Sequence, residues 1–149
     1  MKIFTGADHQ GFHLRNSLIT YLTNAGYEVV DAGDMHLDPQ DDFPIFTERV
    51  VRKMMASEDD DPRGILICGS GQGMCMAANR FKGIRAALGY DKESVRSARN
   101  DDNSNVLCLP ARVLEKDKAN VLVEIWLNTP FAAAPRYKRR LWEIDEFET

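Results

Sequence analysis

A thiol and three glycines stand close together in the segment Cys68-Gly69-Ser70-Gly71-Gln72-Gly73. Glycines at this density let backbone N–H groups converge on an anion where a helix begins. The same N–H groups favour the thiolate form of Cys68, which makes this side chain a candidate base or nucleophile. A second interpretation stays open from the residues alone, in which Cys68 is a small buried apolar side chain.

Known anion-binding motifs do not match this segment. A P-loop requires a lysine directly after its last glycine, but Met74 follows Gly73. The dinucleotide fingerprint G-x-G-x-x-G fails because Met74 stands where its last glycine belongs. A cysteine phosphatase would need an arginine at the same place. The segment is therefore typical of anion binding, but not of these three chemistries.

Other reactive side chains have two interpretations each. His9 is either a phosphate ligand or a cap for the helix that follows it. Arg136 and Arg140 have helical i, i+4 spacing, so they form either a phosphate clamp or a solvated basic face. Cys75 and Cys108 lie in apolar stretches and are expected to be core side chains.

Composition limits the possible classes of function. The chain has 149 residues, with 23 acidic and 19 basic ones, and its net charge of −4 argues against a nucleic-acid binder. No apolar run approaches the ~20 residues that a membrane span requires. The N-terminus becomes polar at Asp8, too early for a signal peptide. Three cysteines without a C-x-x-C pair argue against disulfides or structural zinc and favour the cytoplasm.

Apolar runs alternate with helical patterns along the whole chain. The runs at 1–6, 27–30, 64–68, 85–89 and 106–109 predict five strands. A helix from Pro44 is expected to bury one face, including Met55, and a last helix from Pro135 is expected to turn Leu141 and Ile144 inward. The pattern predicts a single three-layer α/β domain over residues 1–149, with a parallel five-stranded sheet covered on both faces.

Ligands of such sheets bind beyond the carboxyl ends of the strands. Three segments are expected to meet there: the Asp8-His9 pair after the first strand, Cys68 after the third, and residues 101–105 before the fifth. The sequence therefore places the candidate site at one edge of the sheet.

Several motifs in the same order resemble the type B ribose-5-phosphate isomerases and their relatives, the galactose-6-phosphate and allose-6-phosphate isomerases. The resemblance covers nearly the whole chain. It rests on Gly6-Ala7-Asp8-His9-Gln10-Gly11-Phe12, Asp42-Phe43-Pro44, Gly64-Ile65-Leu66-Ile67-Cys68-Gly69-Ser70-Gly71, Ala77-Ala78-Asn79, Gly83-Ile84-Arg85-Ala86-Ala87, Asn105-Val106-Leu107, Arg112-Val113, Arg136 and Arg140.

The resemblance implies a Rossmann-like fold and aldose–ketose isomerisation of a sugar phosphate, without a metal or another cofactor. It also implies a homodimer, or a tetramer, with sites shared between subunits through the C-terminal helix. By position, Cys68 would be the base that moves a proton between C1 and C2. Ser70 and the N–H groups of Gly69, Gly71 and Gly73 would hold the enediolate oxygens, in an oxyanion hole.

The same resemblance implies substrate-binding roles for residues elsewhere in the chain. Asp8 would contact sugar hydroxyls. The phosphate would be held by His9, Arg112, Arg136 and Arg140, the last two from the partner subunit.

Two positions depart from the family pattern. Phe43 stands where a tyrosine is usual, beside the sugar. Asp101-Asp102-Asn103 stands where the family has His-Asn-Asp. That histidine is the family's candidate for opening the sugar ring, so Asp101 takes its catalytic place and Asp102 is a binding position.

These departures leave three functions to compare. A ribose 5-phosphate isomerase fits most of the motifs, and a galactose or allose 6-phosphate isomerase is the alternative. Retention of Cys68 and the glycine loop favours an enzyme, whereas Phe43 and Asp101 favour a sugar-phosphate-binding relative without turnover. A flavodoxin-like electron carrier lacks support from any cofactor motif.

Overall fold

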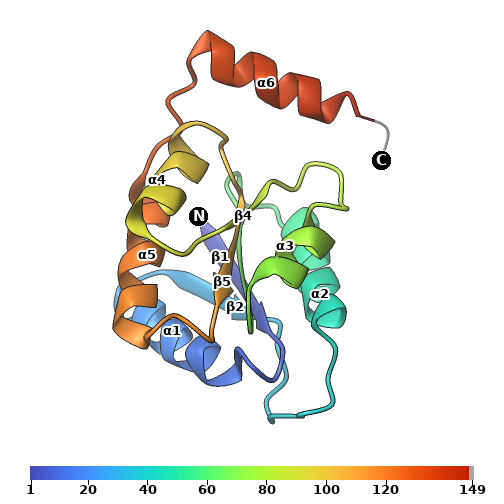
Figure 1. Ribbon diagram of the computed structural model, residues 1–149, viewed down its shortest axis with the longest axis vertical. Helices are drawn as coiled ribbons and strands as arrows, with labels where there is room; N and C mark the ends of the chain where they lie inside the picture. Colours follow the sequence, from blue (N-terminus) through green and yellow to red (C-terminus); the bar gives the residue numbers. More distant parts are fainter. Residues whose placement is uncertain (148–149) are drawn as a thin grey trace.

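The computed structural model describes residues 1–147, in which strands and helices alternate (Figure 1). The elements are β1 (Lys2–Ala7), α1 (Phe12–Asn24), β2 (Glu28–Asp31), α2 (Phe43–Met55), β3 (Arg63–Cys68), α3 (Gln72–Ala78), β4 (Ala86–Leu88), α4 (Lys92–Asn100), β5 (Val106–Pro110), α5 (Lys116–Asn128) and α6 (Pro135–Asp145). The five predicted strands and the α/β class are confirmed.

All strands pair in parallel, in the order β2-β1-β3-β5-β4. From β1 the chain crosses through α1 to β2 on one side, while β3 pairs with the other side of β1. Such a reversal opens a crevice beyond the carboxyl ends of the two central strands. The segments that follow β1 and β3 therefore meet at this crevice.

Two apolar layers cover the two faces of the sheet. One contains Ile65 and Ile67 and packs against α1, α4 and α5, while the other contains Leu66 and Cys68 and packs against α2 and α3. The alternation follows from the strand period of two. It explains why β3 is apolar throughout, because both of its faces are buried.

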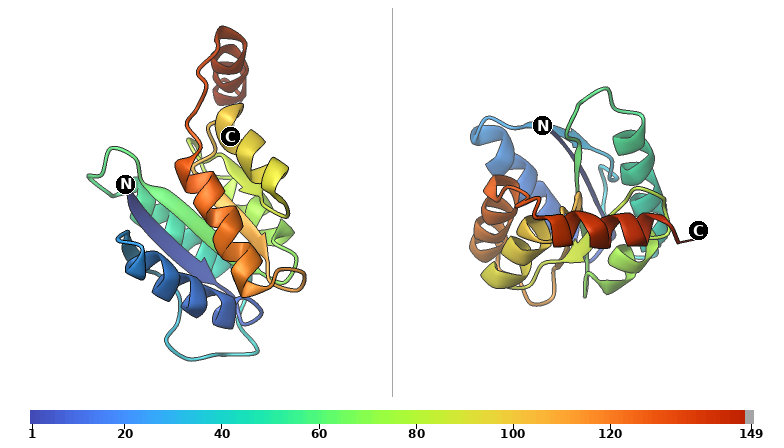
Figure 2. Two further views of the ribbon diagram at one scale, coloured as in Figure 1. Left: turned by 90° about the vertical axis from the view of Figure 1, so that its left-hand side faces the viewer. Right: turned by 90° about the horizontal axis from the view of Figure 1, so that it is seen from above.

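The helix α6 lies apart from the rest of the molecule, beyond the amino ends of the strands (Figure 2). It buries none of its own residues. The expectation that Leu141 and Ile144 face inward is wrong for the isolated chain, because Leu141 is only half-buried and Ile144 is 51% exposed.

A smaller correction concerns α2. Phe46, Val50, Val51 and Met54 are buried as expected, but Met55 is 62% exposed because it continues past the apolar face. Within residues 1–147, every helix is too short or too polar to cross a lipid bilayer.

Candidate active site at the carboxyl edge of the sheet

Cys68 is the last residue of β3, in the centre of the sheet. Its side chain is 4% exposed, and its Sγ accepts a hydrogen bond of 3.2 Å from the N–H of Gly71. An N–H donor stabilises the negative form of its acceptor. The helix α3 that follows has only seven residues, so this local hydrogen bond, rather than a long helix dipole, acts on the thiol.

Gly71 has a φ of +74°, in the left-handed region that glycine tolerates without strain. A Cβ at this position would lie 2.6 Å from Leu88 Cδ1 and 3.1 Å from the Leu109 carbonyl carbon. The loop therefore needs glycine here for two independent reasons, and the resulting turn directs the Gly71 N–H to the sulfur.

Ser70 and Gly73 lie on the outer side of the same loop. The Ser70 Oγ accepts a 3.3 Å hydrogen bond from the N–H of Gln72, which holds the hydroxyl at the start of α3. The half-buried ring of Phe43, the first residue of α2, covers Gly73 so closely that a Cβ would lie 2.7 Å from its Cζ. The structure thus brings Phe43 to the loop.

Asp8 follows β1 and lies in the crevice beside β3, because its N–H donates to the carbonyl oxygen of Ile67. Its carboxylate is 5% exposed and accepts hydrogen bonds from the N–H groups of Gln10, at 2.9 Å, and Gly11, at 3.2 Å. These bonds fix the turn that leads into α1. One edge of the carboxylate is therefore occupied by the backbone.

The half-buried His9 interacts with Asp41, a residue that the sequence reasoning missed. The Asp41 Oδ1 accepts hydrogen bonds from the His9 N–H at 2.9 Å and from its Nδ1 at 2.7 Å. The hydrogen bond to Asp41 raises the pKa of His9 above its ordinary value of 6.5. The expectation that His9 caps α1 is wrong, because Gly11 is the N-cap residue. The available signal was the position of Asp41 directly before Asp42-Phe43-Pro44.

Arg112 lies at the same edge, in the turn after β5. Its N–H donates to the carbonyl oxygen of Gly69, and its Nε donates to Gln10 Oε1 at 2.7 Å. Gln10 therefore positions a guanidinium beside the glycine loop. The sequence reasoning also missed this role of Gln10, because no local pattern links it to Arg112, 102 positions further along the chain.

Asp8, His9 and Asp41 each offer one atom that could bind a metal ion, and these atoms lie within 4.8 Å of one another. Hydrogen bonds already use several of them, because His9 Nδ1 binds Asp41 and the Asp8 carboxylate binds the backbone. The arrangement holds the His9 imidazole against two carboxylates, and it leaves Nε2 of His9 free of the Asp41 contact.

Residues 101–105 are not at this edge, so their expected position at the carboxyl ends is wrong. Asp101 caps the C-terminus of α4, and the N–H of Asn105 donates to the carbonyl oxygen of Arg85, ahead of β4. Both contacts lie at the amino ends of the strands. The physical reason is topological: α4 starts after β4 and returns the chain to the start of β5.

The two aspartates at this amino edge differ in their surroundings. The Oδ1 of Asp101 accepts a 2.7 Å hydrogen bond from the Nδ2 of Asn100. Burial, followed by the charge of Asp101, raises the pKa of the more exposed Asp102, and the nearby Arg140 opposes this shift.

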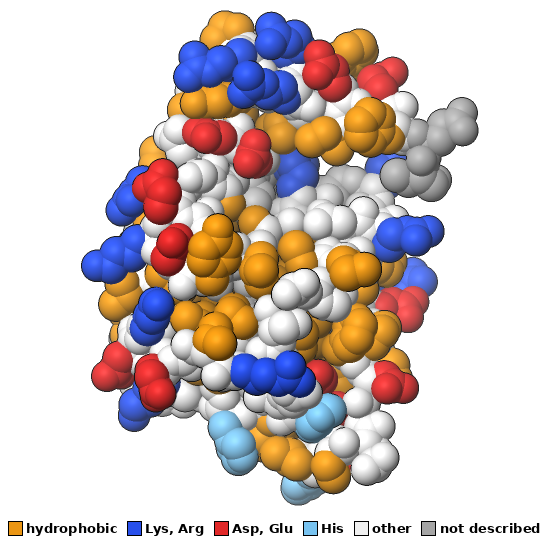
Figure 3. All heavy atoms as spheres, viewed as in Figure 1, with side chains coloured by type: hydrophobic (Ala, Val, Ile, Leu, Met, Phe, Trp, Pro, Cys, Tyr) orange, Lys and Arg blue, Asp and Glu red, His pale blue; other side chains and the backbone are white. Residues whose placement is uncertain are grey.

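Arg136 and Arg140 project from α6 at the same amino edge. Both are exposed, and the guanidinium of Arg136 stacks on its neighbour Tyr137. Figure 3 shows basic side chains gathered on α6 at the top of the molecule, whereas the histidines lie at the opposite end. One chain thus carries two groups of predicted site residues, at opposite edges of its sheet.

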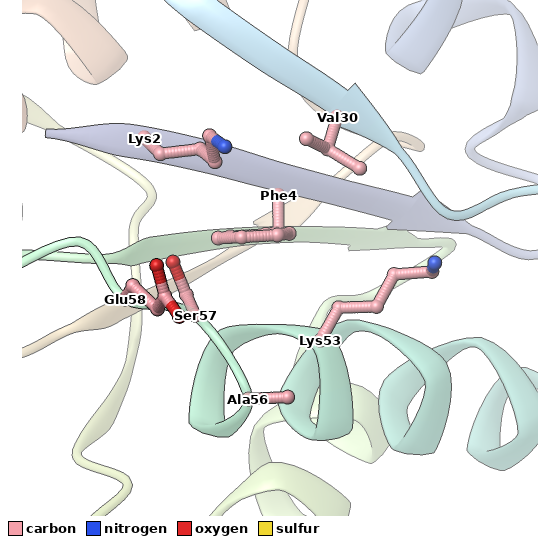
Figure 4. Close-up of a pocket in the computed structure, with 7 residues that line it drawn as sticks. All are labelled: Lys2, Phe4, Val30, Lys53, Ala56, Ser57 and Glu58. Atoms are coloured by element: carbon pink, nitrogen blue, oxygen red, sulfur yellow. The ribbon is translucent and has the colours of Figure 1, made fainter.

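Two other features lie outside this site. Burial raises the pKa of the Cys108 thiol, which keeps it neutral, as the expected core role requires. A separate cavity lies against the amino end of β1 and the end of α2, where the Phe4 ring faces the side chains of Lys53 and Ser57 (Figure 4). No predicted site residue lines this cavity.

Comparison with known proteins places this geometry in a family. The family model described as Ribose/Galactose Isomerase matches residues 3–144. The chain belongs to this family. The match includes the glycine loop, the Asp8 turn and α6, so it covers both edges of the sheet.

Named relatives and solved structures agree along the full length. A probable ribose-5-phosphate isomerase B from Mycoplasma genitalium is 38% identical over 99% of this chain and 95% of its own. The crystal structure of a ribose 5-phosphate isomerase from Thermotoga maritima has a TM-score of 0.91 and 40% identity, covering 98% of both chains. A Mycoplasma genitalium ribose-5-phosphate isomerase B structure with bound ribulose-5-phosphate has a TM-score of 0.91 and 38% identity, covering 97% of this chain and 93% of the other.

Proposed function

We propose that the protein is an aldose–ketose isomerase that interconverts ribose 5-phosphate and ribulose 5-phosphate. The observation that carries the proposal is the Cys68 thiol, buried at the end of β3 and hydrogen-bonded by the N–H of Gly71. A base beside preorganised N–H donors is what proton transfer through an enediolate requires. The relatives named ribose-5-phosphate isomerase B support this substrate.

The proposed reaction moves one proton from C2 to C1 and a second from the C2 hydroxyl to the C1 oxygen, and it leaves no net change in the oxidation state of the sugar. The Cys68 thiolate takes the proton from C2 of the open-chain aldose, and the C1 carbonyl becomes the enolic oxygen of an enediolate. The same thiol returns the proton to C1, the C2 hydroxyl becomes the new carbonyl, and its proton passes to the C1 oxygen, which becomes a hydroxyl. The Gly71 N–H donates to the Cys68 sulfur. The enediolate oxygens are therefore proposed to accept hydrogen bonds from Ser70 and from the N–H groups of Gly69 and Gly73.

Binding of the sugar phosphate is assigned to groups around this loop. Asp8 accepts hydrogen bonds from sugar hydroxyls, and the Phe43 ring packs against the carbon chain. His9 and Arg112 bind the phosphate at the carboxyl edge of the sheet. The hydrogen bond to Asp41 positions His9, and the hydrogen bond to Gln10 positions Arg112.

Arg136 and Arg140 are proposed to reach the phosphate that a second copy of this chain binds. Asp101, in the ring-opening position, and Asp102, in a binding position, would approach the sugar from the same edge. Their place at the opposite edge of the sheet supports this assignment, because α6 and the Cys68 loop lie at opposite ends of one molecule (Figure 1). A largely apolar groove between α6 and the β4 region also supports a second copy, because a partner subunit would bury its apolar side chains. Its apolar lining comes from Ile84, Ala86, Ala87, Leu141, Ile144 and Phe147, beside the polar Asn79, Arg85, Asp102 and Ser104.

Hydrophobic side chains continue below this groove, on the face that carries α3, β4 and α4 (Figure 3). Met76 and Tyr90 are both exposed there. A homodimer that buries this face would cover both the groove and the apolar side of α6. We place the enzyme in the cytoplasm, because a catalytic Cys68 must stay reduced and all three cysteines are free.

A hexose 6-phosphate is the second candidate substrate, with galactose or allose as the sugar. The observation that favours it is the pair of departures from the family pattern, Phe43 and Asp101, at the positions that face the sugar ring. A sugar-phosphate-binding protein without turnover is the third candidate, which the same two departures also favour.

The test is a panel of ribose, galactose and allose phosphates, assayed for aldose–ketose conversion with wild-type and Cys68→Ala protein. Turnover of ribose 5-phosphate by the wild type alone is expected. Faster conversion of a hexose 6-phosphate would overturn the substrate. Binding of a sugar phosphate without conversion of any would overturn the enzymatic function.

A further inference from the structure

The contact between Asp41 and His9 carries an inference beyond the reaction itself. We propose that Asp41 is a positioning residue that holds His9 as an imidazolium directed at the substrate phosphate. The protein therefore still binds phosphate tightly above neutral pH. This inference rests on the proposed phosphate-binding role of His9. Asp41 itself touches no substrate.

The geometry fixes the ring in two ways. One oxygen of Asp41 accepts from both the N–H of His9, at 2.9 Å, and its Nδ1, at 2.7 Å. A carboxylate can only accept, so Nδ1 carries a proton and the ring plane is set. The Nε2 nitrogen then faces away from Asp41, and it donates to a phosphate oxygen only when the ring is charged.

The charges around His9 favour the imidazolium. Asp41 comes from the loop before α2 and Asp8 from the end of β1, and both raise the pKa of His9 against the opposing effect of burial. The neighbouring cation is Arg112, which Gln10 holds by its Nε. Nε2 of His9 and the guanidinium of Arg112 are thus the two donors that this edge offers to a phosphate.

The loop that carries Asp41 is itself held firmly. Arg15 is 1% exposed and donates through Nη2 to the carbonyl oxygen of Asp34, at 2.6 Å. Arg49 binds the carboxylate of Asp34 at 2.7 Å. Closer to the site, the N–H of Asp41 donates to the carbonyl oxygen of Asp38. Asp41 therefore reaches His9 from a fixed backbone rather than from a flexible side chain alone.

The consequence is a pH dependence with a definite sign. A phosphate monoester has a second pKa of ~6 and titrates in the same way with wild type and variant, so a difference between the two proteins from pH 6 to pH 8 comes from the protein. His9 with a raised pKa stays charged into this range, whereas an imidazole with its usual pKa of ~6.5 loses its charge. Removing the Asp41 charge should therefore weaken phosphate binding as the pH rises.

The experiment compares Asp41→Asn with Asp38→Asn in the full chain. Asparagine at 41 keeps an acceptor for the His9 N–H but removes the charge. Asp38→Asn removes the same charge from the same loop and keeps the acceptor that Asp38 offers to Gln40. KM for ribose 5-phosphate and kcat are measured from pH 6 to pH 8.5, and the His9 imidazole is titrated by NMR.

For Asp41→Asn, the expected result is a KM close to wild type at pH 6 that rises to about tenfold above it by pH 8, with kcat little changed. The His9 pKa falls toward its ordinary value. Asp38→Asn follows the wild type in both measurements. A KM raised equally at all pH values, or a His9 pKa unchanged in Asp41→Asn, would overturn the proposal.

A wild type that converts no sugar phosphate would contradict the proposed function but still leave this inference testable. Inorganic phosphate is then titrated against the His9 NMR signal at pH 6 and pH 8. Weaker phosphate binding by Asp41→Asn at pH 8 alone would support the inference, and identical binding by wild type and variant would overturn it.

Discussion

The two edges of the sheet carry the predicted site residues in very different ways. At the carboxyl edge, Cys68 and Asp8 are almost fully buried and bound by backbone N–H groups. At the amino edge, Arg136 and Arg140 are exposed on a helix that buries none of its residues. One chain therefore completes the environment of its proposed base, but not that of its α6 arginines.

The difference shows where preorganisation comes from. Parallel strands end together, so their following turns are fixed by the hydrogen bonds of the sheet itself. A terminal helix has no such frame, and its geometry depends on what packs against it. We expect changes at the carboxyl edge to affect the chemical step, and changes on α6 to affect binding and assembly.

The largest effect is expected for Cys68→Ala. Loss of the proposed base should lower kcat by about 10²–10⁴-fold, because general base catalysis contributes roughly that much. Thermal unfolding should change little by comparison. Cys75→Ala is the matched control, since its thiol contacts the Ala86 carbonyl oxygen and not the loop. A Cys68→Ala protein with near wild-type activity would place the base elsewhere and remove the contrast between the edges.

The next effect concerns α6. Arg136→Ala combined with Arg140→Ala should raise KM by about 10²-fold, because two charge-assisted hydrogen bonds to phosphate are lost. The unfolding free energy should hardly change, since both side chains are exposed.

Mixing that double variant with Cys68→Ala protein tests whether the two edges belong to different subunits of one site. Hybrid dimers then contain one intact site, and random mixing should restore about a quarter of the wild-type activity. Mixed dimers without any recovery would mean that each chain builds its site alone.

A smaller effect, on the free energy of unfolding, distinguishes backbone strain from steric crowding at Gly71. Gly71→Ala and Gly83→Ala both place a Cβ at positive φ, +74° and +83°. The conformational cost is about 1–2 kcal/mol for each. Only Gly71→Ala also meets packed atoms, which adds roughly 1–3 kcal/mol. Chemical denaturation should resolve the difference, and equal losses of stability would show that the loop relaxes freely.

The smallest effect is expected at Asp101. Sugar rings also open spontaneously, so Asp101→Asn should slow isomerisation by only a few-fold when the enzyme is limiting. Asp101→His should be faster than the wild type, because an imidazole with a pKa of ~6.5 both donates and accepts protons at neutral pH. An Asp101→Asn rate equal to wild type would assign ring opening to another group, with Asp102 the next to replace by asparagine.

Much of the fold was predictable because local patterns carried it. The alternating apolar runs predicted all five strands. Gly26, with its φ of +91°, follows the end of α1, as glycine commonly does after a helix. The glycine loop was found for the same reason, since its residues are contiguous. The position of residues 101–105 was predicted wrongly, because the helix that joins two parallel strands returns the chain to the amino end of the second strand.

The sequence by itself determined the local chemistry: a thiol at the end of a buried strand, followed by glycines whose spacing forces a tight turn. It determined this because strand period and glycine conformation act over a few residues. Only the tertiary structure decided that Asp41 meets His9, that Gln10 holds Arg112, and that α6 lies at the far edge from Cys68. These contacts join residues that are distant along the chain, and their distances follow from the strand order and crossovers, which no local pattern specifies.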